Sequence, residues 1–220
     1  MINNLGDSNL FLIRHGQSTY NLENRFTGWK DVGLTELGKN QAIEAGKILN
    51  GINFNFCYTS NLKRAQNTLE LILNQMNQNP IIYRDEALNE RDYGDLIGQN
   101  KAEAADKFGK EQVQIWRRSF DVPPPGGESL EMTAQRTLPY YKKIILPQVL
   151  QGNNIGISAH GNSIRAIVMD IFSLSPEQIL KTEIGWCEPW VISFDSNGKM
   201  QNHQIISRES EPSNSHLFID

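Results

Sequence analysis

The sequence predicts a single α/β domain, a three-layer α/β/α sandwich whose sheet is mostly parallel. Three observations support this prediction. Short apolar runs alternate with stretches of helical periodicity along most of the 220 residues. The chain shows neither an internal repeat nor a long linker. Two of the apolar runs end in a histidine followed by a glycine, and ligands of such sheets bind beyond the carboxyl ends of the strands.

The first two elements follow from local patterns. The apolar residues 10–13 predict a short buried strand. Residues 35–49 predict a helix that Thr35 caps and that Asn50-Gly51 ends. Between them, Gln17-Ser18-Thr19 is typical of the start of a short helix with Ser18 as its cap.

The next three elements continue the alternation. Residues 54–58 predict a second strand, and residues 61–76 predict a helix with apolar side chains at near-helical spacing. Residues 81–83 predict a short third strand.

Glycine and proline divide the middle of the chain. Residues 102–120 predict a helix that is broken near Gly109, and residues 123–127, with three prolines and two glycines, predict a clear break. Residues 128–150 predict a further helix. Pro139 and Pro147 should kink or divide it.

The last elements predict the rest of the sheet. Residues 154–158 predict a strand and residues 161–172 a helix. Residues 190–194 and 200–205 predict a terminal hairpin around Asn197-Gly198. The domain is expected to span residues 1–220, with a polar tail from about residue 207 that composition predicts to be mobile.

Composition excludes several classes of protein. A net charge of -4 argues against a nucleic-acid-binding protein. The sequence contains no run of 18 apolar residues, so no membrane span is predicted. Residues 1–9 do not resemble a signal peptide. Cys57 and Cys187 form no metal-binding or redox motif and are expected to be reduced. We therefore expect a cytoplasmic protein without nucleic-acid or membrane partners.

The two strand-end histidines are the strongest chemical signal. His15 lies between Arg14 and Gly16, and we expect Gly16 to let a ligand approach the backbone. His160 follows residues 154–159 in the same way. A neutral imidazole is nucleophilic and can attack phosphorus, although a single histidine at a strand end is more often only hydrogen-bonded.

Several charged residues are predicted near the same sheet edge. Arg64 comes at the start of a helix, where the helix dipole gives a cation no benefit, and Arg14 and Arg64 together fit a phosphoryl group. Glu90 lies in a charged loop and fits a proton shuttle, or alternatively a surface salt bridge. Lys101, Arg117 and Arg118 are further cation candidates, or alternatively solvated charges. A metal site is the competing interpretation, but Arg14, Arg64 and a nearby Arg165 make a divalent cation costly there.

These segments resemble the cofactor-dependent phosphoglycerate mutases of the histidine phosphatase superfamily over about residues 10–195. The matching segments are residues 12–18, 21–29, 58–65, 88–94, 116–118 and 159–166. The triplet Arg14-His15-Gly16 specifies only the superfamily. Residues 24–29, 88–91 and 116–118 are more specific to the mutases.

The resemblance implies a role for each matching residue. His15 would carry the phosphoryl group, Glu90 would donate and accept the proton, and Arg14, Arg64 and His160 would hold the transferring phosphate. The remaining substrate-binding residues would be Ser18, Asn21, Thr27, Gly28, Tyr93, Lys101, Arg117, Arg118, Gly161 and Asn162. The resemblance also implies priming by 2,3-bisphosphoglycerate, no metal, a small phosphorylated sugar-acid substrate, and a homodimer or homotetramer. The reaction would interconvert 3-phosphoglycerate and 2-phosphoglycerate in glycolysis and gluconeogenesis.

The chain departs from the mutases at several positions. Residues 123–129 are short and also resemble the phosphatase branch of the superfamily, and Asp92 stands where mutases usually have histidine. Residues 185–189 differ from the usual mutase motif, and the tail after Arg208 is short. A short lid would admit water to a phosphohistidine. The alternatives are therefore a histidine-type phosphatase that hydrolyses small phosphomonoesters, and a non-catalytic phosphometabolite-binding protein.

Overall fold

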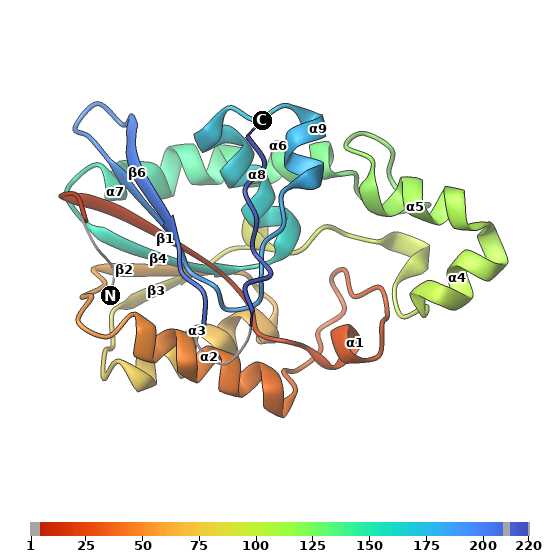
Figure 1. Cartoon of the computed structure of the whole chain (residues 1–220), viewed down its shortest axis with the longest axis horizontal. Coiled ribbons are helices and arrows are strands. Elements are labelled where there is room, and N and C mark those ends of the chain that lie inside the picture. Colours follow the sequence, from red (N-terminus) through yellow and green to blue (C-terminus); the bar gives the residue numbers. More distant parts are fainter. Residues whose placement is uncertain (1–4, 209–211, 220) are drawn as a thin grey trace.

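A six-stranded sheet lies between two layers of helices in the computed structural model, which describes residues 5–208 and 212–219 (Figure 1). The strands are β1 (Ser8–Arg14), β2 (Phe56–Thr59), β3 (Ile81–Arg84), β4 (Asn154–Ala159), β5 (Trp190–Phe194) and β6 (Met200–Ile205). Their order is β3-β2-β4-β1-β5-β6. The first four strands pair in parallel, whereas β5 pairs antiparallel with β1, and β6 pairs antiparallel with β5. The predicted α/β/α sandwich with a mostly parallel sheet is confirmed.

The central strands position the two histidines. β1 pairs with β4 in parallel from Asn9↔Asn154 to Arg14↔Ala159. Residues 9–13 of β1 and 155–159 of β4 are buried, as expected for parallel strands that helices cover on both faces. Because both strands end at the same edge of the sheet, the residues that follow them, His15 and His160, meet there.

Helices cover both faces of the sheet. The helices are α1 (Thr19–Leu22), α2 (Glu36–Ile48), α3 (Lys63–Gln75), α4 (Lys101–Phe108), α5 (Lys110–Arg118), α6 (Leu130–Tyr140), α7 (Leu146–Val149), α8 (Gly161–Phe172) and α9 (Pro176–Lys181). Figure 1 shows α2 and α3 on one face and α6, α7 and α8 on the other. Successive residues of β1 alternate between the faces: Leu10 and Leu12 join the core under α8, whereas Phe11 and Ile13 join the core under α2 and α3.

The predicted helix boundaries agree with the observed ones to within a few residues. Thr35 caps α2 by accepting a hydrogen bond from the Gly38 N–H, and Gly109, at φ 89°, separates α4 from α5. The predicted helix 128–150 consists of α6, a π-helical turn (Tyr141–Ile145) that follows Pro139, and α7. Helix α9 was not predicted, although Ser175 caps it and Pro176 begins it.

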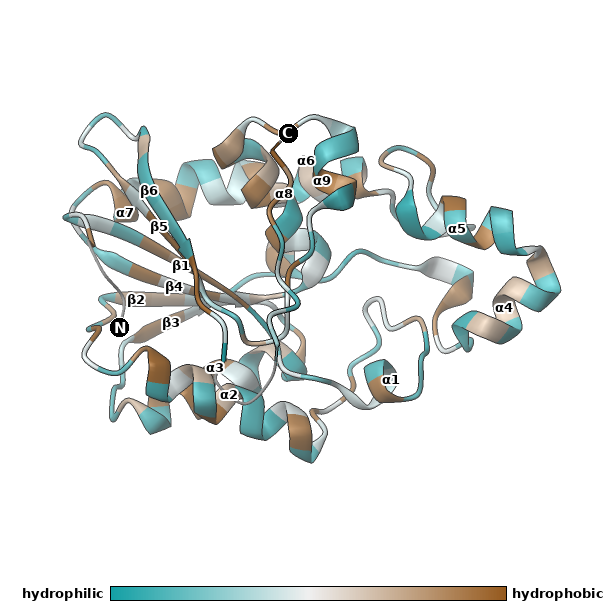
Figure 2. Cartoon of the chain, in the orientation of Figure 1, coloured by the Kyte–Doolittle hydropathy of each residue, from teal (hydrophilic) through white to brown (hydrophobic). Residues whose placement is uncertain are grey.

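Helices α4 and α5 form a lobe that projects from the sandwich (Figure 1, right). Together with the 3₁₀ turn η2 (Gly94–Leu96) they enclose a separate small core, which consists of Phe26, Leu96, Ala104 and Val113. Figure 2 shows hydrophobic and hydrophilic colours alternating along the helices, as expected for helices with one apolar face. We refer to residues 94–118 as the lobe.

Part of the polar tail packs on the rest of the chain. The side chain of Glu188 is fully buried and accepts hydrogen bonds from Ser213 Oγ, Asn214 N and Ser215 N. The tail also pairs with the chain at Glu183, whose backbone exchanges hydrogen bonds with His216. Composition did not predict these contacts. Residues 209–211 and 220 of the tail, and residues 1–4 at the start, lie outside the described residues. Among the described helices, none is both long and apolar enough to cross a membrane.

Candidate active site

The two histidines lie against each other at the carboxyl edge of the sheet. Their ring centroids are 5.0 Å apart. His15 follows β1 and is 3% exposed, and His160 follows β4 and is 0% exposed. The sequence placed both side chains at one edge, and the structure brings them together.

Gly16 has a different role from the one expected. A Cβ atom at this position would collide with the carbonyl group of Gly38 in α2, and a Cβ on Gly38 would collide with the backbone of Gln17. Gly16 therefore allows the chain after β1 to cross closely over α2. The expectation that it opens the backbone to a ligand is not what its surroundings show.

The hydrogen bond of His15 fixes its tautomer. Nδ1 lies 2.7 Å from the carbonyl oxygen of Gly16. A carbonyl can only accept, so Nδ1 carries the proton and Nε2 of the neutral ring keeps its lone pair. Burial, followed by the charges of Arg64 and Arg14, holds the pKa of His15 well below its ordinary value, although the Gly16 hydrogen bond opposes this. The ring is thus neutral at neutral pH, and the lone pair on Nε2 is available to attack phosphorus.

His160 is also held neutral. Its Nε2 shares a hydrogen bond of 2.7 Å with Ser60 Oγ, a partner that sequence analysis did not identify. Burial, followed by the charges of Arg64 and His15, holds the pKa of His160 well below its ordinary value. Its Nδ1 is buried and has no hydrogen-bond partner within the described chain. A buried polar atom of this kind favours an incoming polar ligand.

Two arginines flank the histidines, Arg64 fully buried and Arg14 partly buried. Arg64 is 1% exposed and donates to the carbonyls of Gly28 at 2.8 Å and Lys30 at 3.0 Å. Arg14 donates to the carbonyl of Ile184 at 2.8 Å. Within residues 5–208 and 212–219 neither forms a direct ion pair with a carboxylate, and the Nε atom of each is buried without a partner. Two cations whose Nε atoms are buried without a partner and that have no paired anion are the arrangement that a phosphoryl group stabilises.

Glu90 lies beside the same two cations. Its Oε1 accepts hydrogen bonds from Arg91 N at 2.8 Å, Asn162 N at 3.1 Å and Asn162 Nδ2 at 2.9 Å. Burial alone would raise the pKa of Glu90. The hydrogen bonds from Arg91 and Asn162, followed by the charges of Arg64 and Arg14, lower the pKa overall. The carboxylate is therefore ionised before an anion binds.

A cavity of about 240 Å³ opens beside these residues toward the lobe. Ten of the predicted substrate-binding residues line it: Arg14, Asn21, Thr27, Glu90, Tyr93, Lys101, Arg117, Arg118, Gly161 and Asn162. Arg25, Phe26, Arg165 and Glu183 line it too. Arg165 was expected nearby, whereas Glu183 was not predicted and no local motif marks it. The volume and the cationic lining suit a small, multiply charged anion.

Two predicted binding residues, Ser18 and Gly28, do not line this cavity. Ser18 is fully buried, caps α1 and donates from its hydroxyl to Asn21 Oδ1 at 2.9 Å, so it orients Asn21. Gly28 supplies the carbonyl that holds Arg64. His15, His160 and Arg64 are also not among the lining residues, since they are buried more deeply at the sheet edge.

The described chain offers neither a metal cluster nor an ionised thiol beside this constellation. Residues 5–208 and 212–219 contain no group of three or more histidine, cysteine or carboxylate side chains arranged to hold a metal ion. Cys57 and Cys187 are buried and unpaired, and burial raises the pKa of each thiol to about 12.

Comparisons with known proteins identify the family that the chain resembles. The sequence profile of the histidine phosphatase superfamily (branch 1) matches residues 10–204. The chain is 52% identical over 205 residues to a protein of Parvibaculum lavamentivorans named 2,3-bisphosphoglycerate-dependent phosphoglycerate mutase, covering 91% of this chain and 98% of the relative. A protein of Rhodopseudomonas palustris with the same name is 54% identical over 194 residues, covering 87% of this chain and 94% of the relative.

Solved structures share the fold at lower identity. The Bacillus stearothermophilus protein YhfR superposes with a TM-score of 0.79 at 25% identity, covering 93% of this chain and 98% of that one. A mycobacterial glucosyl-3-phosphoglycerate phosphatase superposes with a TM-score of 0.78 at 23% identity, covering 90% of this chain and 97% of that one. The resemblance that the sequence motifs indicated is confirmed.

Proposed function

The chain belongs to branch 1 of the histidine phosphatase superfamily, and we propose that it is an isomerase that interconverts 3-phosphoglycerate and 2-phosphoglycerate in glycolysis and gluconeogenesis. The observation that carries the proposal is His15, a neutral imidazole beside two arginines whose Nε atoms are buried without a partner and that form no ion pair with a carboxylate among the described residues. The names of the relatives, at more than half identity, favour a mutase over other reactions of the superfamily.

The proposed chemistry passes through His15. In the primed protein Nε2 of His15 carries the phosphoryl group. The free hydroxyl of 3-phosphoglycerate gives its proton to Glu90 and forms a bond to phosphorus while the bond from phosphorus to Nε2 breaks. Nε2 then forms a bond to the phosphorus of the other phosphate while the bond from that phosphorus to the glycerate oxygen breaks, and Glu90 returns the proton to this oxygen. Glu90 is ionised in the free protein, as the first step needs, and a phosphate dianion beside it raises its pKa and favours the protonated form that the second step needs.

The surrounding residues divide the binding work. Arg14, Arg64 and His160 hold the transferring phosphoryl group, because their unpartnered buried nitrogens lie around His15. The rest of the substrate contacts Asn21, Thr27, Tyr93, Lys101, Arg117, Arg118, Gly161 and Asn162, while Ser18 and Gly28 act through Asn21 and Arg64. These side chains bind and orient a phosphorylated sugar acid.

The phosphoryl group that primes His15 comes from 2,3-bisphosphoglycerate in this proposal, and no metal takes part. The donor fits the residues present, since it carries two phosphates and a carboxylate and the cavity is lined by six arginine or lysine side chains: Arg14, Arg25, Lys101, Arg117, Arg118 and Arg165. The same cations make a divalent metal costly there. The names of the relatives support the primer.

A coupled assay for 2-phosphoglycerate tests the proposal. Purified protein receives 3-phosphoglycerate with and without 2,3-bisphosphoglycerate, in excess chelator, and phosphate release is measured in parallel. We expect isomerisation that requires priming and survives chelation. Absence of isomerisation after priming would contradict the mutase, and phosphate release faster than isomerisation would identify a phosphatase.

We propose further that the protein is a cytoplasmic homodimer or homotetramer. The edge strand β3 supports self-association, since it pairs only with β2 among the described strands and exposes Ile81, Ile82 and Tyr83. Measuring the molar mass in solution by light scattering tests the oligomer.

A further inference from the structure

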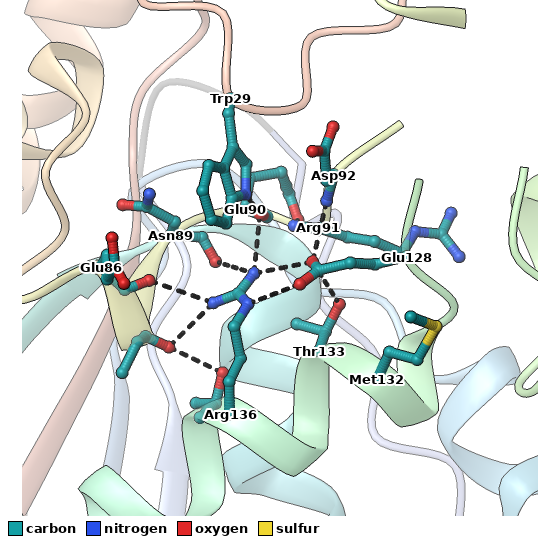
Figure 3. A network of polar contacts seen from close by, with 12 residues as sticks. Trp29, Glu86, Asn89, Glu90, Arg91, Asp92, Glu128, Met132, Thr133 and Arg136 are labelled. Carbon is teal, nitrogen blue, oxygen red and sulfur yellow. Dashed lines mark hydrogen bonds and ion pairs between the residues drawn. The ribbon is translucent and has the colours of Figure 1, made fainter. Parts of the chain in front are cut away.

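The guanidinium group of Arg136, in α6, donates all its hydrogen bonds to one segment of backbone and one carboxylate (Figure 3). It donates to the carbonyls of Glu86, Ala87, Asn89 and Glu90, at 3.2, 3.0, 3.1 and 2.9 Å. Its Nε and Nη2 also donate to the carboxylate of Glu128, at 2.8 and 3.0 Å. The five N–H groups of an arginine are all used by these contacts, so none is left for a substrate.

The segment that Arg136 holds has little structure of its own. Residues 85–92 connect β3 to η2 and contain only the 3₁₀ turn η1 (Glu86–Leu88), so no strand ladder fixes them. The carbonyl of Glu90 accepts a second hydrogen bond, from Trp29 Nε1 at 2.6 Å. The guanidinium carbon of Arg136 lies 5.5 Å from the centre of the Trp29 ring. Two donors that contact each other thus fix the backbone of Glu90.

Glu128 holds the same segment on the other side of Glu90. Its Oε2 accepts a hydrogen bond from Asp92 N at 2.9 Å, and its own N–H donates to the carbonyl of Asp92 at 2.9 Å. Burial would raise the pKa of Glu128, but hydrogen bonds from Arg136, Asp92 and Thr133 lower it, so the group is ionised. The pair with Arg136 carries no net charge, and its effect on Glu90 is therefore mainly geometric.

We propose that Arg136 and Glu128 are positioning residues that fix the Glu90 carboxylate for proton transfer without touching the substrate. This inference rests on the proposed function, in which Glu90 exchanges the proton. Proton transfer requires hydrogen-bond reach, and a displacement of about 1 Å costs roughly 10²-fold in rate. The inference also explains the compact segment 125–129, which the reaction itself does not use: it supplies Glu128 and Ser129, the cap of α6.

Two substitutions test the pair. Arg136→Lys keeps the charge but cannot span four carbonyls, and Glu128→Gln removes the ion pair. We expect each to lower kcat about 10²-fold while KM for 3-phosphoglycerate is unchanged. The limb of the pH–kcat profile that reports Glu90 should move to higher pH, because weaker hydrogen bonds from Arg91 and Asn162 leave burial as the dominant influence on its pKa.

Lys142→Gln is the matched control. It removes the ion pair with Asp170 further along the same helical stretch and does not contact residues 85–92. Thermal unfolding and circular dichroism of each variant measure the folded fraction. Trp29→Phe tests the positioning of Glu90 if the other two variants do not fold, because it removes only one donor to the Glu90 carbonyl. It should lower kcat less and shift the Glu90 limb of the pH–kcat profile in the same direction.

Three results would overturn the inference: unchanged kcat in variants that fold, a fall in kcat that matches the folded fraction without a shift of the limb, or a rise in KM alone. The wild-type protein is measured alongside. If it does not isomerise 3-phosphoglycerate, the proposed function fails; if it does and the variants behave as the control does, only the role of Arg136 and Glu128 fails.

Discussion

The sheet edge and the lobe contribute to the site in different physical states. At the sheet edge His15, His160 and Arg64 are 3%, 0% and 1% exposed, and their pKa values are lowered, first of all by burial. On the lobe Lys101 and Arg117 are only half-buried and Arg118 is exposed. Charge interactions are strong where water is excluded and weak where it is not. In the proposed reaction the edge performs the bond chemistry, whereas the lobe recognises the substrate.

The largest effect should come from His15. His15→Ala removes the atom that bonds phosphorus, so we expect turnover to fall by about 10⁴-fold or more. The protein should remain folded and should carry no phosphoryl group after exposure to 2,3-bisphosphoglycerate, as intact-protein mass spectrometry will show. His203→Ala, on β6, is the control. Turnover within tenfold of wild type would contradict a reaction in which His15 bonds covalently to phosphorus.

On the lobe, Arg117→Gln should act on binding. A charge-assisted hydrogen bond contributes about 1.5–3 kcal/mol, so KM should rise roughly 10- to 100-fold while kcat changes little. Lys110→Gln, an exposed position at the start of α5, is the control on the same helix. Steady-state kinetics with 3-phosphoglycerate give both constants. An equal loss in kcat would show that the lobe takes part in the chemistry, against the division drawn above.

The pH dependence of the free energy of unfolding also distinguishes the sheet edge from the lobe, because only the edge contains buried histidines. Because His15 and His160 have folded pKa values well below the ordinary value of 6.5, the unfolded chain binds protons that the native protein cannot bind as the pH falls below about 6.5. The contribution of the two neutral histidines to the free energy of unfolding should therefore be complete above this pH. It should decrease in acid by up to about 1.4 kcal/mol per pH unit for each histidine.

Urea unfolding at a series of pH values between about 5 and 7.5 measures this slope. This range lies above the usual pKa of carboxylates, so Glu90 and Glu128 contribute little to it. His160→Asn should roughly halve the slope. His203→Asn should change it less, because His203 is only partly buried. An unchanged slope in His160→Asn would show that the histidines at the edge are charged in the native protein.

The sequence was sufficient to predict the sheet and the meeting of the two histidines. Both follow from local patterns, since apolar runs identify β1 and β4 and parallel strands end at one edge. The expected roles of Asn21 and Thr27 came from the family resemblance, because nothing in their local pattern distinguishes them from surface residues. Helix α9 was missed although Ser175-Pro176 is a readable start signal.

Arg136 and Glu128 show what a local pattern cannot contain. Arg136 contacts carbonyls 46 to 50 residues away in the chain, and these contacts exist only because α6 packs beside residues 86–90. A carbonyl is present at every position, so no residue type in that segment signals the partner. Glu183 is similar, since its importance depends on two arginines that the fold brings to it from α5 and α8.

The smallest effect should come from Glu183, an anion that lines the cavity beside Arg118 and Arg165. Its carboxylate accepts hydrogen bonds from Arg118 and Arg165, each at 2.7 Å. Burial would raise its pKa, but these two arginines lower it, so Glu183 is ionised and competes with an anionic substrate for both. Glu183→Gln keeps the size and removes the charge. Since the Glu183 side chain is 41% exposed, such pairs contribute only about 0.2–1 kcal/mol, and KM should fall about two- to fivefold with kcat unchanged.

Salt provides the internal check on this prediction. The difference in KM between Glu183→Gln and wild type should shrink as ionic strength rises, because exposed charges are screened. Glu177→Gln, which removes an exposed pair with Lys181 away from the cavity, should leave KM unchanged. A rise in KM in Glu183→Gln would mean that the carboxylate holds Arg118 and Arg165 in the orientation that the substrate needs. The residues on the lobe would then be pre-organised by ion pairs, as those at the sheet edge are by burial. The two regions would differ only in how exposed their side chains are.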